Sequence, residues 1–327
     1  MIKFNSVFGD ELSDFLLLRK VSMSKSTYDH DCYYLKKFDK YIFDNAFTTK
    51  IITEDMITGW INTLTGKSSS IANEVIVIRI FLKYLNTSGI SVYIPPVPKV
   101  SDDYVPYIFS DIELKNIFAL ADNIQMTKAQ PNPYIQIEYP LALRLMYGCG
   151  LRIGETLSLK MKDVDLDAGV LILRHTKGNK QRLVPMHASL TSIINNYCMI
   201  MGLVGNPEAL LFPGVSPDIP MSKNSALHRF ESILKLADIS LPGRKKHQRG
   251  PCMHCFRHVF TFKSFMNAEK AGHKIDDSVP YLSIYLGHDS LRETEKYLKF
   301  SSEMYPDAME LFEDYTSEIF PEVDYEE

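Results

Sequence analysis

Near the carboxyl end of the chain, residues 285–300 contain two side chains that could take part in covalent chemistry, His288 and Tyr297. A tyrosine can act as a nucleophile, and we interpret Tyr297 as the candidate for that role. The Leu286-Gly287 pair can end a helix, because glycine tolerates the left-handed conformation that helix ends often adopt. His288 is therefore expected at a helix junction, where it and Tyr297 could border one pocket. For this stretch alone, an ordinary pair of helices with a half-buried tyrosine is the alternative.

Basic side chains that could bind an anion lie upstream. His254 and Arg257 are three residues apart, so a helix would project both from one face toward the same ligand. Arg152 follows an apolar helix that glycines end. This setting indicates a buried guanidinium, which needs acceptors such as a phosphate group or Glu155. A surface arginine is the alternative.

A small sheet is predicted between these two groups. Residues 164–173 and 183–186 are the clearest strand candidates in the chain. The turn between them, over residues 176–181, would present Lys177. Lys180 and Arg182 are the alternatives to Lys177 as the functional basic residue of this turn.

In chain order the candidates are Arg152, Lys177, His254, Arg257, His288 and Tyr297. This series resembles the active-site signature of the tyrosine recombinases, the phage integrase family. The match covers roughly residues 105–300, and the N-terminal half fits in outline. The resemblance implies a mainly α fold with a small antiparallel β-sheet. It would consist of an N-terminal four-helix core-binding domain and a mixed α/β catalytic domain of the tyrosine recombinase type.

The resemblance also implies a reaction. Tyr297 would attack a DNA phosphodiester to give a 3′-phosphotyrosyl link and a free 5′-hydroxyl group. Anionic phosphate oxygens repel a nucleophile, so Arg152 and Arg257 would neutralise charge in the pentavalent transition state. The covalent link conserves the bond energy, so rejoining needs neither ATP nor a metal ion, and no cofactor is expected. The function would be that of a site-specific DNA recombinase, either an integrase or a transposon recombinase of a mobile genetic element.

The remaining candidates receive supporting roles from the same resemblance. Lys177 would be the general acid for the leaving 5′-oxygen, and His254 would assist proton transfer at Tyr297. His288 would hydrogen-bond a phosphate oxygen. Glu155 would orient the basic groups.

The net charge of −4 is not spread evenly along the chain. Residues 306–327 hold nine acidic residues and no basic one, so the rest carries 36 Lys and Arg against 31 Asp and Glu. A modestly basic body can bind phosphates if its charges gather on one face. The acidic tail also has apolar positions and would suit docking into a neighbouring subunit. Packing against its own subunit is the alternative.

Composition favours a cytoplasmic protein that does not enter a membrane. No apolar run approaches the length of a membrane span, and the N-terminus lacks the apolar stretch of a signal peptide. The five cysteines are odd in number and scattered, which suits a reducing compartment. Cys252, His254 and Cys255 could suggest zinc, but a structural zinc site needs four ligands and no second pair has fitting spacing. We therefore expect no metal.

With 327 residues, 45% of them hydrophobic, the chain is long enough for two domains. Helical periodicity over residues 1–98 predicts four helices that begin near Phe8, Ser24, Thr53 and Ser68. Prolines mark residues 99–107 as a linker. A catalytic domain over 108–305 and the tail over 306–327 follow, and residues 268–280 would be an insertion relative to the family.

Basic residues in three regions are candidates for contacting the DNA backbone. They are Lys36 and Lys37 in the N-terminal helices, Lys180 and Arg182 around the predicted turn, and Arg244, Lys245, Lys246 and Arg249 in a Gly- and Pro-flanked loop. A solvated charged surface is the alternative for each one. No pattern in the sequence indicates which bases are read.

Double-stranded DNA is the expected partner, bound by a homotetramer on paired sites, together with any accessory recombination factors. Two other functions remain open. One is a type IB topoisomerase-like enzyme that nicks and reseals a single DNA. The other is a catalytically inactive DNA-binding accessory protein.

Overall fold

The computed structural model describes residues 3–100, 106–125, 132–174, 181–240 and 250–295. The chain divides into two compact units, Met1–Tyr104 and Val105–Glu327. Among the described residues, no helix is both long enough and apolar enough to cross a membrane.

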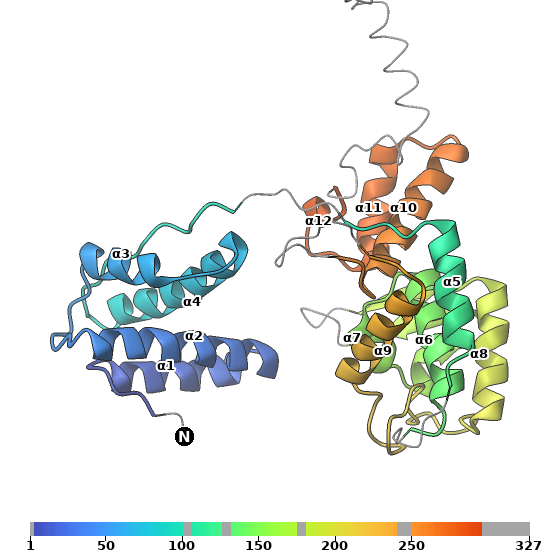
Figure 1. The fold of residues 1–327 in the computed structure, drawn as a ribbon, viewed down its shortest axis with the longest axis horizontal. Helices are drawn as coiled ribbons and strands as arrows, with labels where there is room; N and C mark the ends of the chain where they lie inside the picture. Colours follow the sequence, from blue (N-terminus) through green and yellow to red (C-terminus); the bar gives the residue numbers. More distant parts are fainter. Residues whose placement is uncertain (1–2, 101–105, 126–131, 175–180, 241–249, 296–327) are drawn as a thin grey trace, which may run out of the picture. The chain divides into compact units, whose positions relative to one another are not determined.

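The first unit is helical (Figure 1). It contains α1 (Gly9–Ser22), α2 (Lys25–Asp44), α3 (Glu54–Thr63) and α4 (Ser68–Thr87). Side-chain caps fix two of the starts, because Ser24 accepts a hydrogen bond from the Thr27 N–H and Thr53 accepts one from the Met56 N–H. An aromatic core that includes Phe38, Trp60 and Phe81 packs between the helices. The four predicted helices of this region are confirmed.

The second unit is mixed α/β. Its elements are α5 (Asp111–Asp122), α6 (Ile135–Cys149), α7 (Ile153–Leu157), η1 (Met161–Asp163), β1 (Val164–Asp165), β2 (Val170–Leu173), β3 (Arg182–Pro185), α8 (Ala188–Ile200), α9 (Lys223–Leu236), α10 (Cys255–Lys270), α11 (Ile275–Leu286) and α12 (Leu291–Glu295). Helix α6 packs against α5, α8 and α10 around one apolar core. The short helix α7 follows α6 directly, so this core holds the start of α7 in place.

The predicted antiparallel sheet is confirmed, with the strand order β1-β2-β3. In its register Leu173 pairs with Arg182 and Val170 pairs with Pro185. The segment predicted as a turn, which contains Lys177, therefore comes between β2 and β3 in the chain. That turn lies outside the described residues.

Two glycines end the helices that lead to the candidate site. Helix α6 ends at Gly150 and α11 ends at Gly287, both in the left-handed conformation, and the helix end predicted at Leu286-Gly287 is confirmed. A Cβ atom on Gly150 would lie 2.6 Å from the Phe260 ring. Only glycine fits there, so the end of α6 can lie close against α10.

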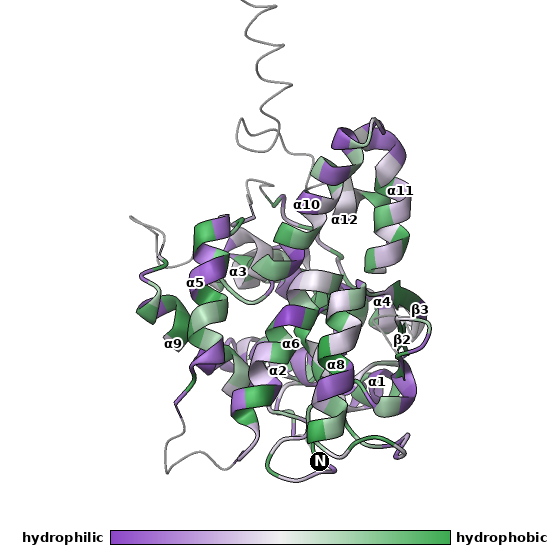
Figure 2. Ribbon diagram, turned by 90° about the vertical axis from the view of Figure 1, so that its right-hand side faces the viewer, coloured by the Kyte–Doolittle hydropathy of each residue, from purple (hydrophilic) through white to green (hydrophobic). Residues whose placement is uncertain are grey.

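Helices α10 and α11 form a hairpin over much of the region interpreted as an insertion. The connection between them is hydrophilic (Figure 2), whereas Phe265, Val279 and Leu282 pack together in a small apolar cluster. Helix α11 contains Pro280 in its interior, although proline usually breaks a helix. Pro280 is exposed, so the carbonyl group that its missing N–H would bind can turn to water.

Candidate active site

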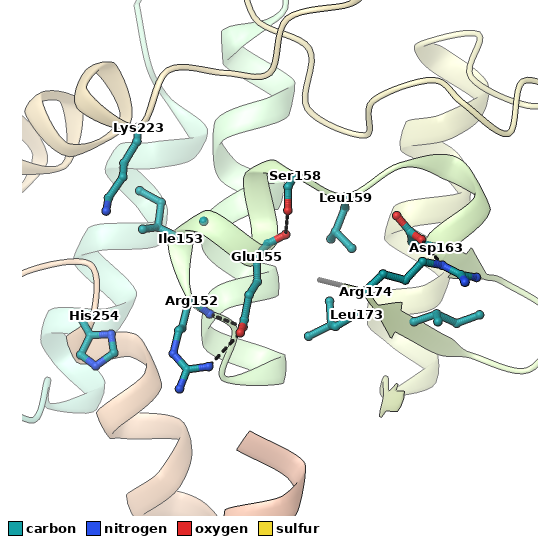
Figure 3. Close-up of a pocket in the computed structure, with 12 residues that line it drawn as sticks. Arg152, Ile153, Glu155, Ser158, Leu159, Asp163, Leu173, Arg174, Lys223 and His254 are labelled. Atoms are coloured by element: carbon teal, nitrogen blue, oxygen red, sulfur yellow. Dashed lines mark hydrogen bonds and ion pairs between the residues drawn. The ribbon is translucent and has the colours of Figure 1, made fainter. Parts of the chain in front are cut away.

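A pocket of about 430 Å³ opens beside α7 (Figure 3). Its basic lining residues are Arg152, Arg174, Lys223 and His254, and its acidic ones are Glu155 and Asp163. They come from α7 and its N-cap, from η1 and α9, and from the residues next to β2 and α10, so segments far apart in the sequence meet here. Asp163 is already paired with Arg174, whose Nε lies 2.9 Å from a carboxylate oxygen. The lining is suited to an anionic ligand.

Arg152 occupies the N-cap position of α7, between Gly150 and the first turn of the helix. Its side chain is 27% exposed, and Nη1 donates to Glu155 Oε1 at 2.8 Å. Nη2 lies 3.4 Å from the Gly287 carbonyl oxygen. The acceptor expected from the sequence, Glu155, is therefore the one observed. The guanidinium itself is half-buried and borders the pocket.

Glu155 is held from two sides. Its carboxylate accepts the N–H of Arg152 at 3.0 Å as well as the Arg152 side chain, and Arg182 donates to both of its oxygens. Burial alone would raise the pKa of Glu155, but the hydrogen bonds and charges of Arg182 and Arg152 outweigh it and hold the pKa at about 2. Glu155 is therefore a carboxylate at neutral pH although its side chain is only 9% exposed.

Arg257, in the first turn of α10, is 1% exposed. Nη1 donates to the Gly150 carbonyl at 2.8 Å and Nη2 to the Leu286 carbonyl at 2.7 Å. One side chain thus ties the end of α6 to the end of α11. His254 precedes the same helix at its N-cap position, is exposed and lines the pocket.

His288 follows directly after α11, at the helix junction predicted for it. Its Nδ1 atom lies 2.6 Å from the Thr294 hydroxyl of α12. Burial and, after it, the nearby charges of Arg257, Arg152, Arg182 and His254 together lower its pKa to about 3. His288 is therefore neutral at pH 7. The described candidates Arg152, His254 and Arg257 are close enough to this ring for their charges to act on it.

Several candidates fall outside the described residues, namely Lys177, Lys180, Arg244, Lys245, Lys246, Arg249 and Tyr297. In the first unit, Lys36 is exposed on α2. Lys37 is engaged, because its Nζ atom lies 2.6 Å from a carboxylate oxygen of Glu74.

Sequence reasoning missed Lys223 and Arg174 as pocket residues. Lys223 is the first residue of α9 and carried no signal beyond its charge. Arg174 comes directly after β2 and before the lysine turn, and this position could have drawn attention to it.

The cysteine pair considered for zinc lies at the start of α10. The sulfur atoms of Cys252 and Cys255 are 3.7 Å apart. Within the part of the chain that the structure describes, no three His, Cys, Asp or Glu side chains are grouped so as to hold a metal ion.

Known structures share this fold. The chain of the XerH site-specific recombinase bound to palindromic difH substrate superposes with a TM-score of 0.67 at 21% identity, covering 89% of this chain and 81% of that one. The Tn1549 transposon integrase in complex with transposon right end DNA gives a TM-score of 0.63 at 14% identity, covering 95% and 100%. At these identities the similarity concerns the fold.

Sequence comparison identifies the family. The putative integrase/recombinase y4rB of Sinorhizobium fredii is 29% identical over 283 residues, which are 83% of this chain and 87% of the relative. The tyrosine recombinase XerC of Rhizobium meliloti is 28% identical over 237 residues, 67% of each chain. The sequence model of the phage integrase family matches residues 113–304, more than half of the chain. The chain therefore belongs to the phage integrase family, as a site-specific tyrosine recombinase.

Proposed function

We propose that this recombinase cuts and rejoins double-stranded DNA with Tyr297 as the nucleophile. The observation that carries the proposal is the cationic surrounding of His288, where the charges of Arg257 and Arg152 act on one ring. A phosphodiester placed in the adjoining pocket would meet fixed positive charge, which stabilises the additional negative charge of the pentavalent transition state. The DNA-bound recombinases of the same fold support DNA as the ligand.

The two arginines would contribute differently. Arg152 borders the pocket, and Glu155 fixes one edge of its guanidinium, so the remaining donors can bind phosphate oxygens in one orientation. Arg257 is buried and joins two helix ends, so it would act through its charge and by keeping Gly150 and Leu286 in place. Neutral His288 can donate a hydrogen bond to a phosphate oxygen from Nε2 when Nδ1 accepts from Thr294.

Proton transfer completes the proposed reaction. Tyr297 loses its phenolic proton as its oxygen bonds to phosphorus, and exposed His254 assists that transfer. The bond from phosphorus to the 5′-oxygen breaks, and Lys177 protonates the leaving oxygen. Reversal of these steps with another 5′-hydroxyl group rejoins the strand.

The test is covalent trapping on a suicide DNA duplex, nicked near the cleavage point so that the 5′-hydroxyl fragment diffuses away. The duplex is built from the DNA that flanks the gene. We expect a protein-DNA adduct with the wild type and none with Tyr297→Phe. An adduct that persists in Tyr297→Phe would contradict the assignment of the nucleophile.

Tyr285→Phe is the matched control. The Tyr285 ring stacks on Phe260 at 5.3 Å, and its hydroxyl donates to the Pro185 carbonyl at 3.4 Å. Burial raises the pKa of Tyr285, which makes it a poor nucleophile. We expect this variant to form the adduct. Relaxation of supercoiled DNA that lacks the flanking sequence would instead favour a topoisomerase-like enzyme.

The wider organisation is part of the same proposal. Residues 1–98 would be the core-binding domain, with Lys36 and Lys37 near the DNA backbone, and residues 108–305 the catalytic domain. The protein would act in the cytoplasm as a tetramer on paired sites, with the tail over 306–327 docking between subunits and accessory factors directing the reaction. Sedimentation of the protein with and without a duplex carrying two sites tests the tetramer.

A further inference from the structure

Arg182, the first residue of β3, was a candidate for DNA contact, but the structure places its guanidinium inside the protein. The side chain is 8% exposed. Nη1 lies 3.1 Å from Glu155 Oε1 and Nη2 lies 2.8 Å from Glu155 Oε2, which is the bidentate geometry of a strong arginine-carboxylate pair. A DNA backbone outside the protein would not reach donors buried in this way.

The same guanidinium also lies against the end of α11. A Cβ atom on Gly287 would be 2.9 Å from Arg182 Nη1 and 3.2 Å from its Cζ. The carbonyl oxygen of Gly287 accepts from Arg152, and the next residue is His288. Arg182 therefore lies against the Glu155 carboxylate, which lines the pocket, and against the backbone just before His288.

The net charge of the group explains why two arginines, Arg152 and Arg182, bind the one carboxylate of Glu155. If Arg152 were the only partner of Glu155, the pair would be neutral, and a phosphate would gain little from Arg152. With Arg182 the three side chains carry one net positive charge. Because Arg182 occupies both carboxylate oxygens, Arg152 can turn its charge to the pocket without leaving Glu155 buried and unpaired.

We propose that Arg182 is a positioning residue for the recombination reaction, which fixes Glu155 and thereby keeps the charge of Arg152 available to the scissile phosphate. This inference rests on the function proposed above. Arg182 touches neither the DNA nor the reacting atoms, so its effect passes through Arg152 and through the Gly287 backbone. Other charged groups around the pocket are His254, Lys223 and the Arg174-Asp163 pair.

The experiment measures the single-turnover rate of adduct formation on the suicide duplex, together with DNA affinity. We expect Arg182→Gln to lower the rate on the order of 10²-fold, as for misplacement of a catalytic group, with DNA affinity unchanged. Arg182→Lys keeps the charge without the bidentate geometry, so its loss should be smaller. An equal loss in both variants, or a loss of affinity that accounts for the rate, would overturn the proposal.

A double variant separates this role from a purely structural one. In Arg182→Gln, Glu155 neutralises Arg152, whereas the added change Glu155→Gln removes that negative charge. The double variant should therefore cleave faster than Arg182→Gln alone. If the rate reductions of the two single variants simply multiply in the double variant, the two residues act independently and the inference is rejected.

Arg144→Gln is the matched control, because Arg144 also forms a two-bond pair, with Asp122, at 2.7 Å for each bond and away from the pocket. It should cleave at the wild-type rate. If the wild type forms an adduct that requires Tyr297 but Arg182→Gln cleaves normally, only this inference fails. If the wild type forms no adduct, the proposed function fails first, and the inference with it.

Discussion

Two buried glutamates of the second unit show opposite behaviour. Glu155 beside the pocket is bound by two arginines, and its pKa is about 2. Glu138 in α6 is fully buried and accepts one hydrogen bond from the Asn132 amide at 2.6 Å. Burial, which this hydrogen bond only partly offsets, raises its pKa to about 7. Burial disfavours the charge in both, so the neighbouring cations decide which carboxyl group stays ionised.

The difference distinguishes a carboxylate that lines the pocket from a carboxyl group in the core. Glu138 can take up a proton at neutral pH at little cost, because one of its oxygens has no hydrogen-bond partner among the described residues. Glu155 cannot, because two guanidinium groups depend on its charge. Substitutions at these two positions should therefore have different consequences.

The largest expected effect comes from removing the site carboxylate. Glu155→Ala leaves Arg152 and Arg182 close together without a counter-charge, and removing one partner of a buried ion pair costs about 3 kcal/mol of unfolding free energy. Denaturant unfolding measures the loss. The control Asp122→Ala removes the exposed partner of Arg144 and should cost less than about 1 kcal/mol. Equal losses in both variants would remove the distinction between the two kinds of pair.

The next effect concerns His288, a neutral ring that the same cations keep from taking up a proton. Its pKa falls from 6.5 to about 3 on folding, so the unfolded chain binds the extra proton between these values. The contribution of His288 to the unfolding free energy therefore has its full value above pH 6.5 and is lost as the pH falls toward 3. We expect His288→Asn to weaken this acid dependence of the unfolding free energy. An unchanged pH profile would show that the ring is not desolvated as described.

Thr294→Val is the control for that experiment. It removes the hydrogen bond to His288 but keeps the titrating ring, so the acid dependence should remain.

The smallest change in unfolding free energy is expected at Glu138, and its pH dependence has the opposite sign to that of His288. Its pKa rises from 4.5 to about 7 on folding, so its contribution to stability is complete below pH 4.5 and is lost as the pH rises through 7. Glu138→Gln mimics the protonated group and should remove this loss while leaving the cleavage rate unchanged. Unfolding free energies compared at acidic and mildly basic pH measure it, and a variant as pH-dependent as the wild type would contradict the interpretation.

The sequence predicted the features that depend on local rules. The helix end at Leu286-Gly287, the helix starts near Ser24 and Thr53, and the short sheet follow from the backbone preferences of glycine, the hydrogen bonds of short polar side chains, and strand periodicity. The pairing of Arg152 with Glu155 could also be predicted, because the two residues are one helical turn apart.

Contacts between distant segments could not be predicted in this way. Arg182 was interpreted as a DNA contact because it lies beside other basic residues in the sequence. Nothing in the sequence indicated that its side chain occupies the space beside Gly287. Lys223 reaches the pocket through the packing of α9. These outcomes depend on tertiary packing, which periodicity does not encode.

Two hydrogen bonds that Arg257 donates to backbone carbonyl groups have a consequence for how the protein is made. They join α10 to the Gly150 carbonyl, 107 residues earlier in the chain, and to the Leu286 carbonyl, 29 residues later. During synthesis the amino-terminal parts emerge and fold first. The arrangement around Arg257 closes only after Leu286 has left the ribosome, so a nascent or prematurely terminated chain would lack the completed cationic site. The DNA cleavage proposed above would therefore wait until the chain has been synthesised through Leu286.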